Sequence, residues 1–490
     1  MNKYISIFFC VQIIALNLFA MQPKVTPVDY VRPQIDTHKS RWFFFSSASR
    51  PFGMVSLSPD TWTEGSWNSG YLYNSKEIRC FSHVHCWQLA GVPVMPTTGE
   101  VKGHKGMDAY KSTYSHETEI VKPGYHKVEL DTYQIRVELT STSRVGMHRY
   151  TYPAGEKANV LFDVGALLAH GKTEKAAIHR ISSKEIGGYS VLAPTSRRKK
   201  PVTVYFVARF NQNMTAFGGW EKEGKEKKLV HKNSIEGADI GGYASFGKLK
   251  KQTLLMKVGI SYVSEEQARI NLEKELAHWN FDRVKEDAFA EWNRELGKIT
   301  VEGGSEEEKI KFYTDLWHSL LGRHTFSDFN GKYIDNTGEE PVVRQVPLDN
   351  GTPTRNTYNS DAFWGSEFNL NILWSIAYPK VMSEFVSTLV DYYTNGGMIA
   401  RGPSGGNYTY VMVGDQATPL IAAAYNKGIR DFDIESAYQG CLKNSEPGGI
   451  RDYVGYKTNP GNFMQQYVDK GFVPEPTTKS PHAEGCAMTL

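Results

Sequence analysis

The segment FSHVHC at residues 81–86 places two histidines, His83 and His85, two positions apart. Alternate residues of a β-strand point to the same side, so on a strand both imidazoles would share one face. Two imidazoles on one face can bind a metal ion or form hydrogen bonds with a substrate. They can equally serve as buried hydrogen-bonding groups of the fold, and the sequence leaves these roles open.

Two tryptophans near this segment, Trp67 and Trp87, supply flat aromatic faces of the kind that stack on sugar rings. A tryptophan in a β-rich region also commonly fills the hydrophobic core, so both roles stay open for each residue. Asp60 stands in the sequence SPDT, which predicts a residue in a turn.

A second set of candidate residues lies in the later half of the chain. The segment DAFWGSE at residues 361–367 combines two carboxylates with an indole, so Asp361, Trp364 and Glu367 are candidates for contacting a substrate. Asp415 lies between a glycine and a glutamine at a predicted loop-to-helix boundary. There it either caps the helix or contacts the substrate directly.

Sequence patterns of several other chemistries are missing. The chain has no Walker A motif, no dinucleotide-binding glycine pattern after a strand and no HExxH motif. Residues 402–406 match Gly-x-Ser-x-Gly by letter, but they lie in a predicted loop, not between a strand and a helix. No two cysteines form a CxxC pair, which argues against a zinc or iron–sulfur site. Whether the later cysteines pair in disulfides stays open: Cys80, Cys86, Cys441 and Cys486.

The elements that position these residues change character along the chain. Residues 25–262 contain short alternating or β-branched runs separated by turn residues, which predicts an antiparallel β-sandwich. The lysine- and glutamate-rich run 221–228 predicts a solvated hairpin tip. Runs of this kind include 125–130, 135–139, 158–162, 202–207 and 254–262.

Helical spacing begins after Ser264, a predicted N-cap. Apolar residues recur at helical intervals over 265–296, and a short strand-like segment follows at 299–302. Paired helices joined by polar, aromatic loops then predict an (α/α) toroid with its binding site on the loop face. Further helical segments are 310–321, 382–390, 419–425 and 434–442.

Composition limits the class of protein. A formal charge of +3 over 490 residues is nearly neutral, which gives no support to nucleic-acid binding. Residues 1–20 have a positive start and a short apolar run, which predicts a secretory signal peptide and an exported protein of the bacterial periplasm or cell surface. No later segment predicts a transmembrane span.

Several segments, taken in chain order, resemble glycoside hydrolase family 92. PFGMVSLSPDT at 51–61 is similar to a signature near the N-terminus of that family. Further matching segments are GYLY at 70–73, FSHVH at 81–85, MP at 95–96, DAFW at 361–364, VGDQ at 413–416, KGIRDFD at 427–433 and GCAMTL at 485–490. Because they occur in order from about residue 27 to the last residue, the resemblance covers nearly the whole chain.

The resemblance implies an N-terminal β-sandwich followed by an (α/α)6 toroid, and an exo-α-mannosidase that removes mannose from N-glycans or mannans with inversion. Inversion requires a carboxylic acid and a carboxylate roughly 6.5–9.5 Å apart. The resemblance also implies a bound calcium ion as cofactor. Family members commonly carry aspartate where this chain has Gly365, so Glu367 is expected to substitute for it, or the sugar recognised is expected to differ.

The family's general acid, its base and most of its calcium ligands are expected beyond Leu490, so no catalytic residue is assigned within the chain. The toroid is accordingly expected to be incomplete, and residues 1–490 alone are expected to be inactive. We expect a signal peptide at 1–20, a β-sandwich at 21–263, a helical linker at 264–304 and the start of the toroid at 305–490. The alternatives are another toroid glycosidase or phosphorylase, or a non-catalytic glycan-binding protein.

Overall fold

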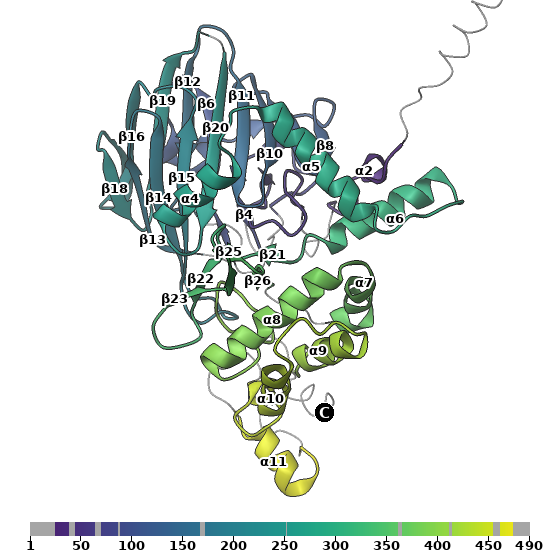
Figure 1. Cartoon of the computed structure of the whole chain (residues 1–490). Coiled ribbons are helices and arrows are strands. Elements are labelled where there is room, and N and C mark those ends of the chain that lie inside the picture. Colours follow the sequence, from purple (N-terminus) through teal and green to yellow (C-terminus); the bar gives the residue numbers. More distant parts are fainter. Residues whose placement is uncertain are drawn as a thin grey trace, which may run out of the picture.

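An all-β part and a helical part follow each other along the chain in this computed structural model (Figure 1). The predicted two-part fold is therefore confirmed. The described residues are 25–38, 45–63, 70–86, 89–166, 172–250, 252–360, 365–410, 414–453 and 461–473.

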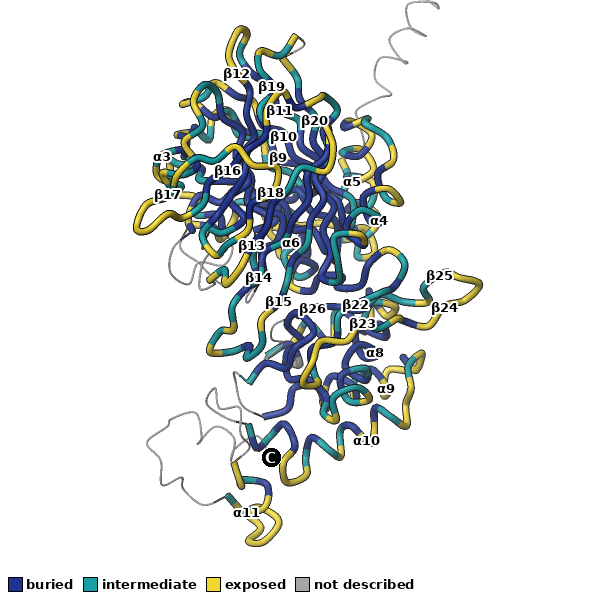
Figure 2. The backbone as a smooth tube through the Cα atoms, turned by 90° about the vertical axis from the view of Figure 1, so that its left-hand side faces the viewer, coloured by how far each residue is buried: buried dark blue, intermediate teal, exposed yellow. Residues whose placement is uncertain are grey.

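Two antiparallel sheets form the β part, and apolar side chains fill the space between them. Val160, Phe162, Phe206 and Ile260 belong to this core, which lies within the dark-blue interior of Figure 2. The first sheet has the order β1 (Ser58–Asp60), β3 (Cys80–Ser82), β6 (Val94–Thr98), β12 (Lys157–Phe162), β19 (Gly241–Lys248), β16 (Ala216–Glu223) and β17 (Glu226–Val230). The second has the order β18 (Ser234–Gly237), β13 (Thr173–Arg180), β14 (Glu185–Leu192), β15 (Val202–Phe210), β20 (Thr253–Ser261), β11 (Val145–Thr151), β10 (Ile135–Ser141), β9 (Tyr125–Leu130) and β8 (Ile120–Lys122).

The strand predictions are confirmed at β9, β10, β12, β15 and β20. The lysine-rich run forms the hairpin β16–β17, and its turn contains Gly224 with φ of +63°, a conformation that glycine adopts without strain. Five small two-stranded sheets complete the strands: β2 (Glu77–Ile78) with β7 (Ser112–Thr113), β4 (Val84–His85) with β5 (Ala90–Gly91), β21 (His324–Thr325) with β26 (Tyr358–Asn359), β22 (Lys332–Asp335) with β23 (Val342–Gln345), and β24 (Leu348–Asp349) with β25 (Thr352–Pro353).

Residues 265–296 form two helices, α4 (Glu265–Glu275) and α5 (Phe281–Leu296), where the apolar spacing had suggested one continuous segment. Each helix has its own cap, because Ser264 accepts a hydrogen bond from the Gln267 amide and Asn280 accepts one from the Arg283 amide. Helix α4 packs on β20 and β15, and α5 packs on β10, so both cover the second sheet. Gly259 permits the contact with α4, because a Cβ there would lie 2.4 Å from the Ala268 carbonyl oxygen.

The strand-like segment at 299–302 was wrongly predicted, because its residues have no pairing strand and form no β-ladder. Ile299 and Val301 are instead partly buried against the apolar core of the helical part. Apolar and polar residues alternate there because one side of this segment packs on the helices.

The helical part is organised around α8 (Pro379–Gly396), which contacts α7, α9 and α10. Pro379 occupies the first turn of α8, and Gly397 ends the helix with φ of +86°. Each of the four predicted helical segments is confirmed, whereas α7 and α11 were not predicted. The helices are α6 (Glu306–Ser319), α7 (Leu370–Ala377), α9 (Ala417–Asn426), α10 (Ile434–Asn444) and α11 (Phe463–Lys470), with η2 (Ser366–Phe368) and η3 (Ile450–Asp452) between them; α2 (Pro27–Tyr30), η1 (Gly103–Lys105) and α3 (Met107–Tyr110) lie earlier in the chain.

Two further expectations concern the cysteines and the membrane. Cys80, Cys86 and Cys441 are thiols in this structure, and Cys486 lies outside the described residues. Among the residues whose placement is described, no helix combines the length and the apolar character needed to cross a bilayer.

Candidate functional site

Asp60, the last residue of β1, and His85 in β4 form a buried ion pair where the first sheet approaches the helical part. His85 Nε2 lies 2.8 Å from Asp60 Oδ1, and His85 Nδ1 lies 2.6 Å from the Ser56 carbonyl oxygen. Both neighbours are acceptors, so both ring nitrogens carry protons and the imidazole is cationic. Burial alone lowers the pKa of His85, but the charge and hydrogen bond of Asp60 outweigh burial and raise it.

The second carboxylate oxygen of Asp60 accepts hydrogen bonds from the Ser82 hydroxyl and the Cys80 thiol. Gly70 closes over the pair, because a Cβ there would lie 2.3 Å from Asp60 Oδ1 and 2.7 Å from His85 Nε2. The Gly70 carbonyl in turn accepts hydrogen bonds from the amides of Thr61 and Trp62. Asp60 is therefore the centre of a polar cluster joining three segments of the chain, and the predicted turn role was wrong.

His83, which lies between β3 and β4, belongs to a chain of neutral groups. Its Nδ1 lies 2.7 Å from the Val92 carbonyl oxygen and its Nε2 lies 2.9 Å from His148 Nε2. The Tyr150 hydroxyl lies 2.8 Å from His148 Nδ1. Burial lowers the pKa of His83 to about 4 and that of His148 well below its ordinary value. This network is closed on itself, since every ring nitrogen has a partner.

The segment at 51–61 reaches across to the helical part. The Phe52 ring makes edge contacts with Trp374 on α7 and with Tyr378, and the Phe52 carbonyl accepts a hydrogen bond from the Thr325 amide. The Gly53 carbonyl lies 3.0 Å from His324 Nδ1. The β part and the helical part therefore share one packed junction.

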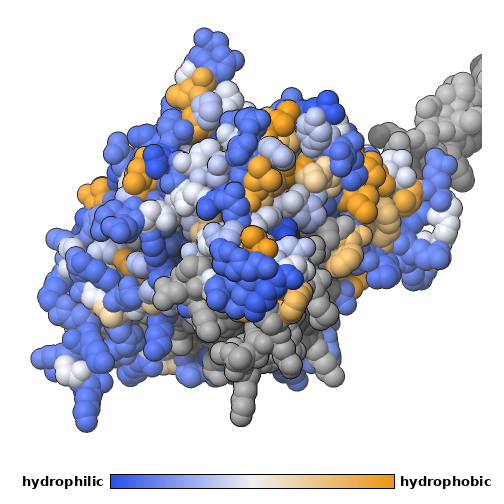
Figure 3. All heavy atoms as spheres, turned by 90° about the horizontal axis from the view of Figure 1, so that it is seen from below, coloured by the Kyte–Doolittle hydropathy of each residue, from blue (hydrophilic) through white to orange (hydrophobic). Residues whose placement is uncertain are grey.

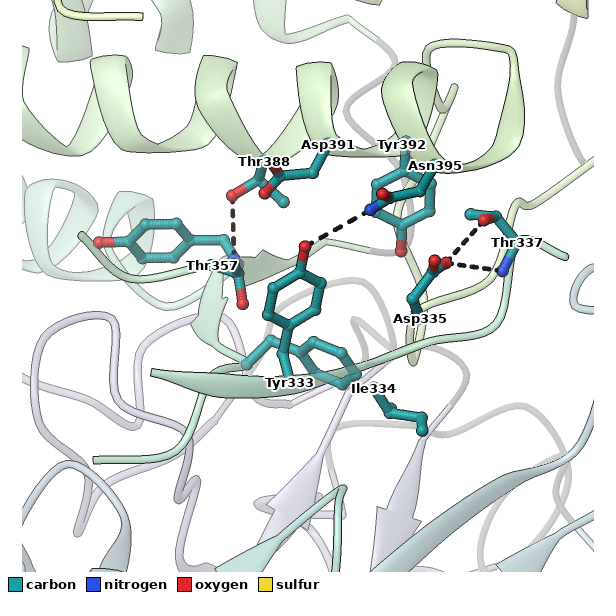
Figure 4. Close-up of a pocket in the computed structure, with 12 residues that line it drawn as sticks. Tyr333, Ile334, Asp335, Thr337, Thr357, Thr388, Asp391, Tyr392 and Asn395 are labelled. Atoms are coloured by element: carbon teal, nitrogen blue, oxygen red, sulfur yellow. Dashed lines mark hydrogen bonds between the residues drawn. The ribbon is translucent and has the colours of Figure 1, made fainter. Parts of the chain in front are cut away.

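Ionised and polar groups of the helical part line a small cavity at this junction (Figure 4). Arg355 donates two hydrogen bonds to the Asp391 carboxylate at 2.7 and 2.8 Å. Burial nevertheless raises the pKa of Asp391. Figure 4 shows the Tyr333 hydroxyl directed at the Asn395 amide, with Asp391 and Thr388 on the helix above. The cavity measures about 10 Å³, which is room for about one water molecule and none for a sugar ring.

The glycine-rich loop at 401–409 is fixed by backbone contacts. Arg401 is almost fully buried and donates hydrogen bonds to the carbonyl oxygens of Gly414, Ile450 and Tyr453. Asn359 accepts a hydrogen bond from the Gly405 amide at 2.6 Å. Ser404, the central residue of the Gly-x-Ser-x-Gly match, is fully buried in the loop. A serine in this position does not present an exposed nucleophile.

Comparison with known families decides the affiliation. Residues 30–261 match the glycosyl hydrolase family 92 N-terminal domain, and residues 267–490 match the glycosyl hydrolase family 92 catalytic domain. The chain belongs to glycoside hydrolase family 92. The predicted resemblance is therefore confirmed.

Solved family 92 structures share the fold. An α-mannosidase from Bacteroides thetaiotaomicron is 26% identical, with a TM-score of 0.80 over 93% of this chain and 60% of that protein. An inverting mannosidase from the same organism is 22% identical, with a TM-score of 0.79 over 94% and 60%. A curated relative from Arthroderma benhamiae, described as an uncharacterized secreted glycosidase, is 23% identical over 82% of this chain and 50% of its own. The chain thus spans about half the length of that relative.

The structure places two of the seven predicted substrate-contacting side chains. His85 has both ring nitrogens engaged, which favours its alternative role in holding the fold. Asp415 accepts hydrogen bonds from the Ala417 and Thr418 amides at the start of α9 and from Asn444, as a capping residue does. Contact of either residue with a glycan stays a prediction. Trp67, Trp87, Asp361 and Trp364 lie outside the described residues, and of Glu367 only the backbone is described, in η2.

Several buried ionisable groups of this family 92 chain were not singled out by the sequence analysis. Asp328 is almost fully buried, and burial raises its pKa to about 7 although Asn271 and Ser261 donate hydrogen bonds to it. Asp391 and Asp335 line the small cavity, and Arg355 is hydrogen-bonded to Asp391. No local sequence pattern marks these residues, because their partners lie far away along the chain.

The calcium ion implied by the resemblance has no evident site among the described residues. No group of three or more histidine, cysteine, aspartate or glutamate side chains within them is arranged to hold a metal ion. Calcium prefers six to eight oxygen ligands, and the carboxylates of Asp60 and Asp391 already accept hydrogen bonds from side chains, so these two do not offer free ligands.

Proposed function

We propose that this chain provides the β-sandwich and the first helices of an inverting exo-α-mannosidase acting on α-linked mannosides of N-glycans or mannans. The observation that carries the proposal is the match of both family 92 domains together with 26% identity to a solved α-mannosidase. A second structure, titled as that mannosidase in complex with mannoimidazole, supports a mannose-like ligand for the relative. This chain would contribute the junction between the β part and the helical part, on which such a site would be built.

We propose further that residues 1–490 alone do not hydrolyse mannosides. The family resemblance implies that the general acid, the general base and most of the calcium ligands lie beyond Leu490. Two observations support the proposal: the cavity beside Asp391 measures only about 10 Å³, and the carboxylates of Asp60 and Asp391 are each paired with a basic side chain. Calcium dependence remains part of the proposal for the complete enzyme.

The test uses purified residues 1–490 and α-linked mannobiosides, with released mannose measured in the presence of calcium and after chelation. We expect no release above the buffer blank in either condition. Turnover that a chelator abolishes would overturn the inactivity. Calorimetric titration with the same mannobiosides tests the remaining alternative, a non-catalytic glycan-binding protein. Such a protein would bind the mannobiosides equally well with and without the chelator and would release no mannose.

The phosphorylase alternative loses its main support. A phosphorylase needs a phosphate pocket of basic and serine-rich groups, and Arg401 with the following loop is the segment of this sequence that could suggest one. The buried Arg401 guanidinium donates hydrogen bonds to three backbone carbonyls, so it is engaged within the protein.

We also propose export to the periplasm or cell surface, supported by the signal-like residues 1–20 and by the curated relative's description as secreted. Fractionation of the producing cells tests this.

A further inference from the structure

The small cavity beside Asp391 contains a buried hydroxyl group whose hydrogen-bonding capacity is unused. Thr357 lines this cavity and is 1% exposed, and its Oγ1 has no hydrogen-bond partner among the described residues. Hydrophilic side chains on the molecular surface, such as those that cover much of the face seen from below in Figure 3, are hydrated by bulk solvent. The Thr357 hydroxyl is out of reach of bulk solvent, and an unsatisfied group of this kind destabilises a fold.

Tyr333 on β22 and Asp391 on α8 present further polar groups to the same cavity (Figure 4). Among the described residues, the Tyr333 hydroxyl accepts only a long hydrogen bond, of 3.5 Å, from Asn395 Nδ2. Each carboxylate oxygen of Asp391 accepts one hydrogen bond from Arg355, and a carboxylate oxygen can accept a second. The cavity therefore brings together three groups, from three separate segments of the chain, that can each form another hydrogen bond.

The size and the charge of the cavity favour one kind of ligand. A volume of about 10 Å³ is room for one water molecule, and buried waters in proteins typically form about three hydrogen bonds. Two carboxylates line the cavity, and each is paired with an arginine: Asp391 with Arg355, and Asp335 with Arg344. These pairs leave no net charge that would favour a bound ion.

We propose that the cavity binds one water molecule, which accepts a hydrogen bond from the Thr357 hydroxyl and donates one to the Asp391 carboxylate. The Tyr333 hydroxyl is its third partner. The water ties the β22–β23 hairpin and the segment before β26 to helix α8, since a hydrogen bond through an ordered water is nearly as favourable as a direct one. This bound water belongs to the packing of the helical part and is independent of the proposed function.

Urea unfolding of the Thr357→Val variant of residues 1–490 tests the bound water. Valine has nearly the shape of threonine but lacks the hydroxyl, so the water would lose a partner. We expect the equilibrium constant of unfolding to rise about fivefold. A dry cavity predicts the opposite result, because the variant would then remove an unsatisfied buried hydroxyl and stabilise the fold.

Thr97→Val is the matched control. Thr97 lies on β6, is 2% exposed and also has an Oγ1 without a hydrogen-bond partner among the described residues, but it does not line this cavity. We expect the Thr97→Val variant to be as stable as wild type or more stable. If Thr357→Val has the same effect as Thr97→Val, the cavity is dry and the proposal is overturned.

A high-resolution crystal structure of residues 1–490 gives the direct test and requires no variant. We expect electron density for one water within hydrogen-bond distance of Thr357 Oγ1 and of an Asp391 carboxylate oxygen. Crystals grown with rubidium in place of sodium distinguish water from a monovalent cation, because a bound rubidium ion gives a strong anomalous signal. Absence of the density, or a rubidium peak in the cavity, would also overturn the proposal.

Discussion

His83 and His148 share one proton between their Nε2 atoms, which lie 2.9 Å apart in the interior of the β part. The Val92 carbonyl fixes the proton of His83 on Nδ1, so His83 Nε2 accepts and His148 Nε2 donates. His148 Nδ1 then accepts from the Tyr150 hydroxyl. Both imidazoles are thereby neutral, and a second proton on His83, at Nε2, would face the proton on His148 Nε2 in a buried site.

We predict that this pair makes the fold sensitive to acid. The folded-state pKa of His83 is about 4 and that of His148 is also depressed, whereas unfolded histidine titrates near 6.5. The unfolded chain therefore binds protons that the folded chain does not, and stability present above pH 6.5 is lost as the pH falls toward 4. His148→Gln removes one such group. It should flatten the dependence of unfolding free energy on pH in this window by up to about 1.4 kcal/mol per pH unit.

The measurement is urea unfolding of wild type and His148→Gln at several pH values from 7.5 to about 4.5. The pKa values of His85 and Asp328 are also shifted, but both residues are present in both proteins, so their contributions cancel in the comparison. If the unfolding free energies of wild type and His148→Gln change in parallel with pH, the histidine pair does not stay neutral in the folded state.

Breaking the Asp60–His85 ion pair is predicted to have the opposite dependence on pH. The pKa of His85 is raised, so its contribution to stability is complete below about pH 6.5 and is lost as the pH rises through the folded pKa. Asp60→Asn removes the carboxylate and leaves the buried imidazolium without a counter-charge. We expect a loss of about 3–5 kcal/mol at pH 6, and less at pH 8.

Nuclear magnetic resonance titration of the His85 ring, with Asp60→Asn beside wild type, should show a lower pKa in the variant. Asp282→Asn is the control, because Asp282 pairs with Arg149 at an exposed position. Its effect should stay below about 1 kcal/mol. An equal loss in both variants would mean that burial of the Asp60 pair has no energetic consequence.

The coarse fold was predictable because it depends on local patterns. Alternation located the strands, and the capping serine at 264 located the change to helices. Helix α7 escaped prediction because its sequence, LNILWSIA, spans only about two turns, too few for a helical interval to recur. The break between α4 and α5 escaped because Asn280 caps α5 within a segment that keeps apolar residues at helical intervals.

The arrangement of side chains at the junction was less predictable. His83 and His85 were predicted to share one face of a strand, but His83 lies between β3 and β4. Their partners come from residues 56, 60, 92 and 148, and no pattern in one sequence links these positions. Asp60 looked like a turn residue because its neighbours are proline and threonine. The Arg355–Asp391 pair joins a loop to a helix, a contact that only the tertiary structure creates.

The contact between Phe52 and Trp374 is predicted to couple the β part to the helical part. Phe52 is 8% exposed and joins the apolar core of the helices, so Phe52→Ala leaves a cavity at the junction. We expect a loss of about 3–5 kcal/mol and a less cooperative thermal transition. Phe329→Ala is the control at an exposed phenylalanine and should change stability by under about 0.5 kcal/mol. Calorimetry of both variants distinguishes a shared core from two independent units, since independent units would leave the helical transition unchanged.

Asn371 is the residue whose replacement we predict to stabilise the protein. It is 1% exposed on α7, and neither its amide nitrogen nor its amide oxygen has a hydrogen-bond partner among the described residues. Each unsatisfied buried polar group costs about 1–3 kcal/mol, so Asn371→Leu, of similar volume, should raise stability by about 1–2 kcal/mol. Asn444→Leu is the matched control, because Asn444 is equally buried but bonds the Ile399 backbone and Asp415. Asn444→Leu should lower the free energy of unfolding by about 2 kcal/mol or more, because the partner groups of Asn444 would lose their hydrogen bonds. Thermal unfolding of both variants decides the matter: if Asn371→Leu destabilises as much as Asn444→Leu, the amide of Asn371 is satisfied in solution.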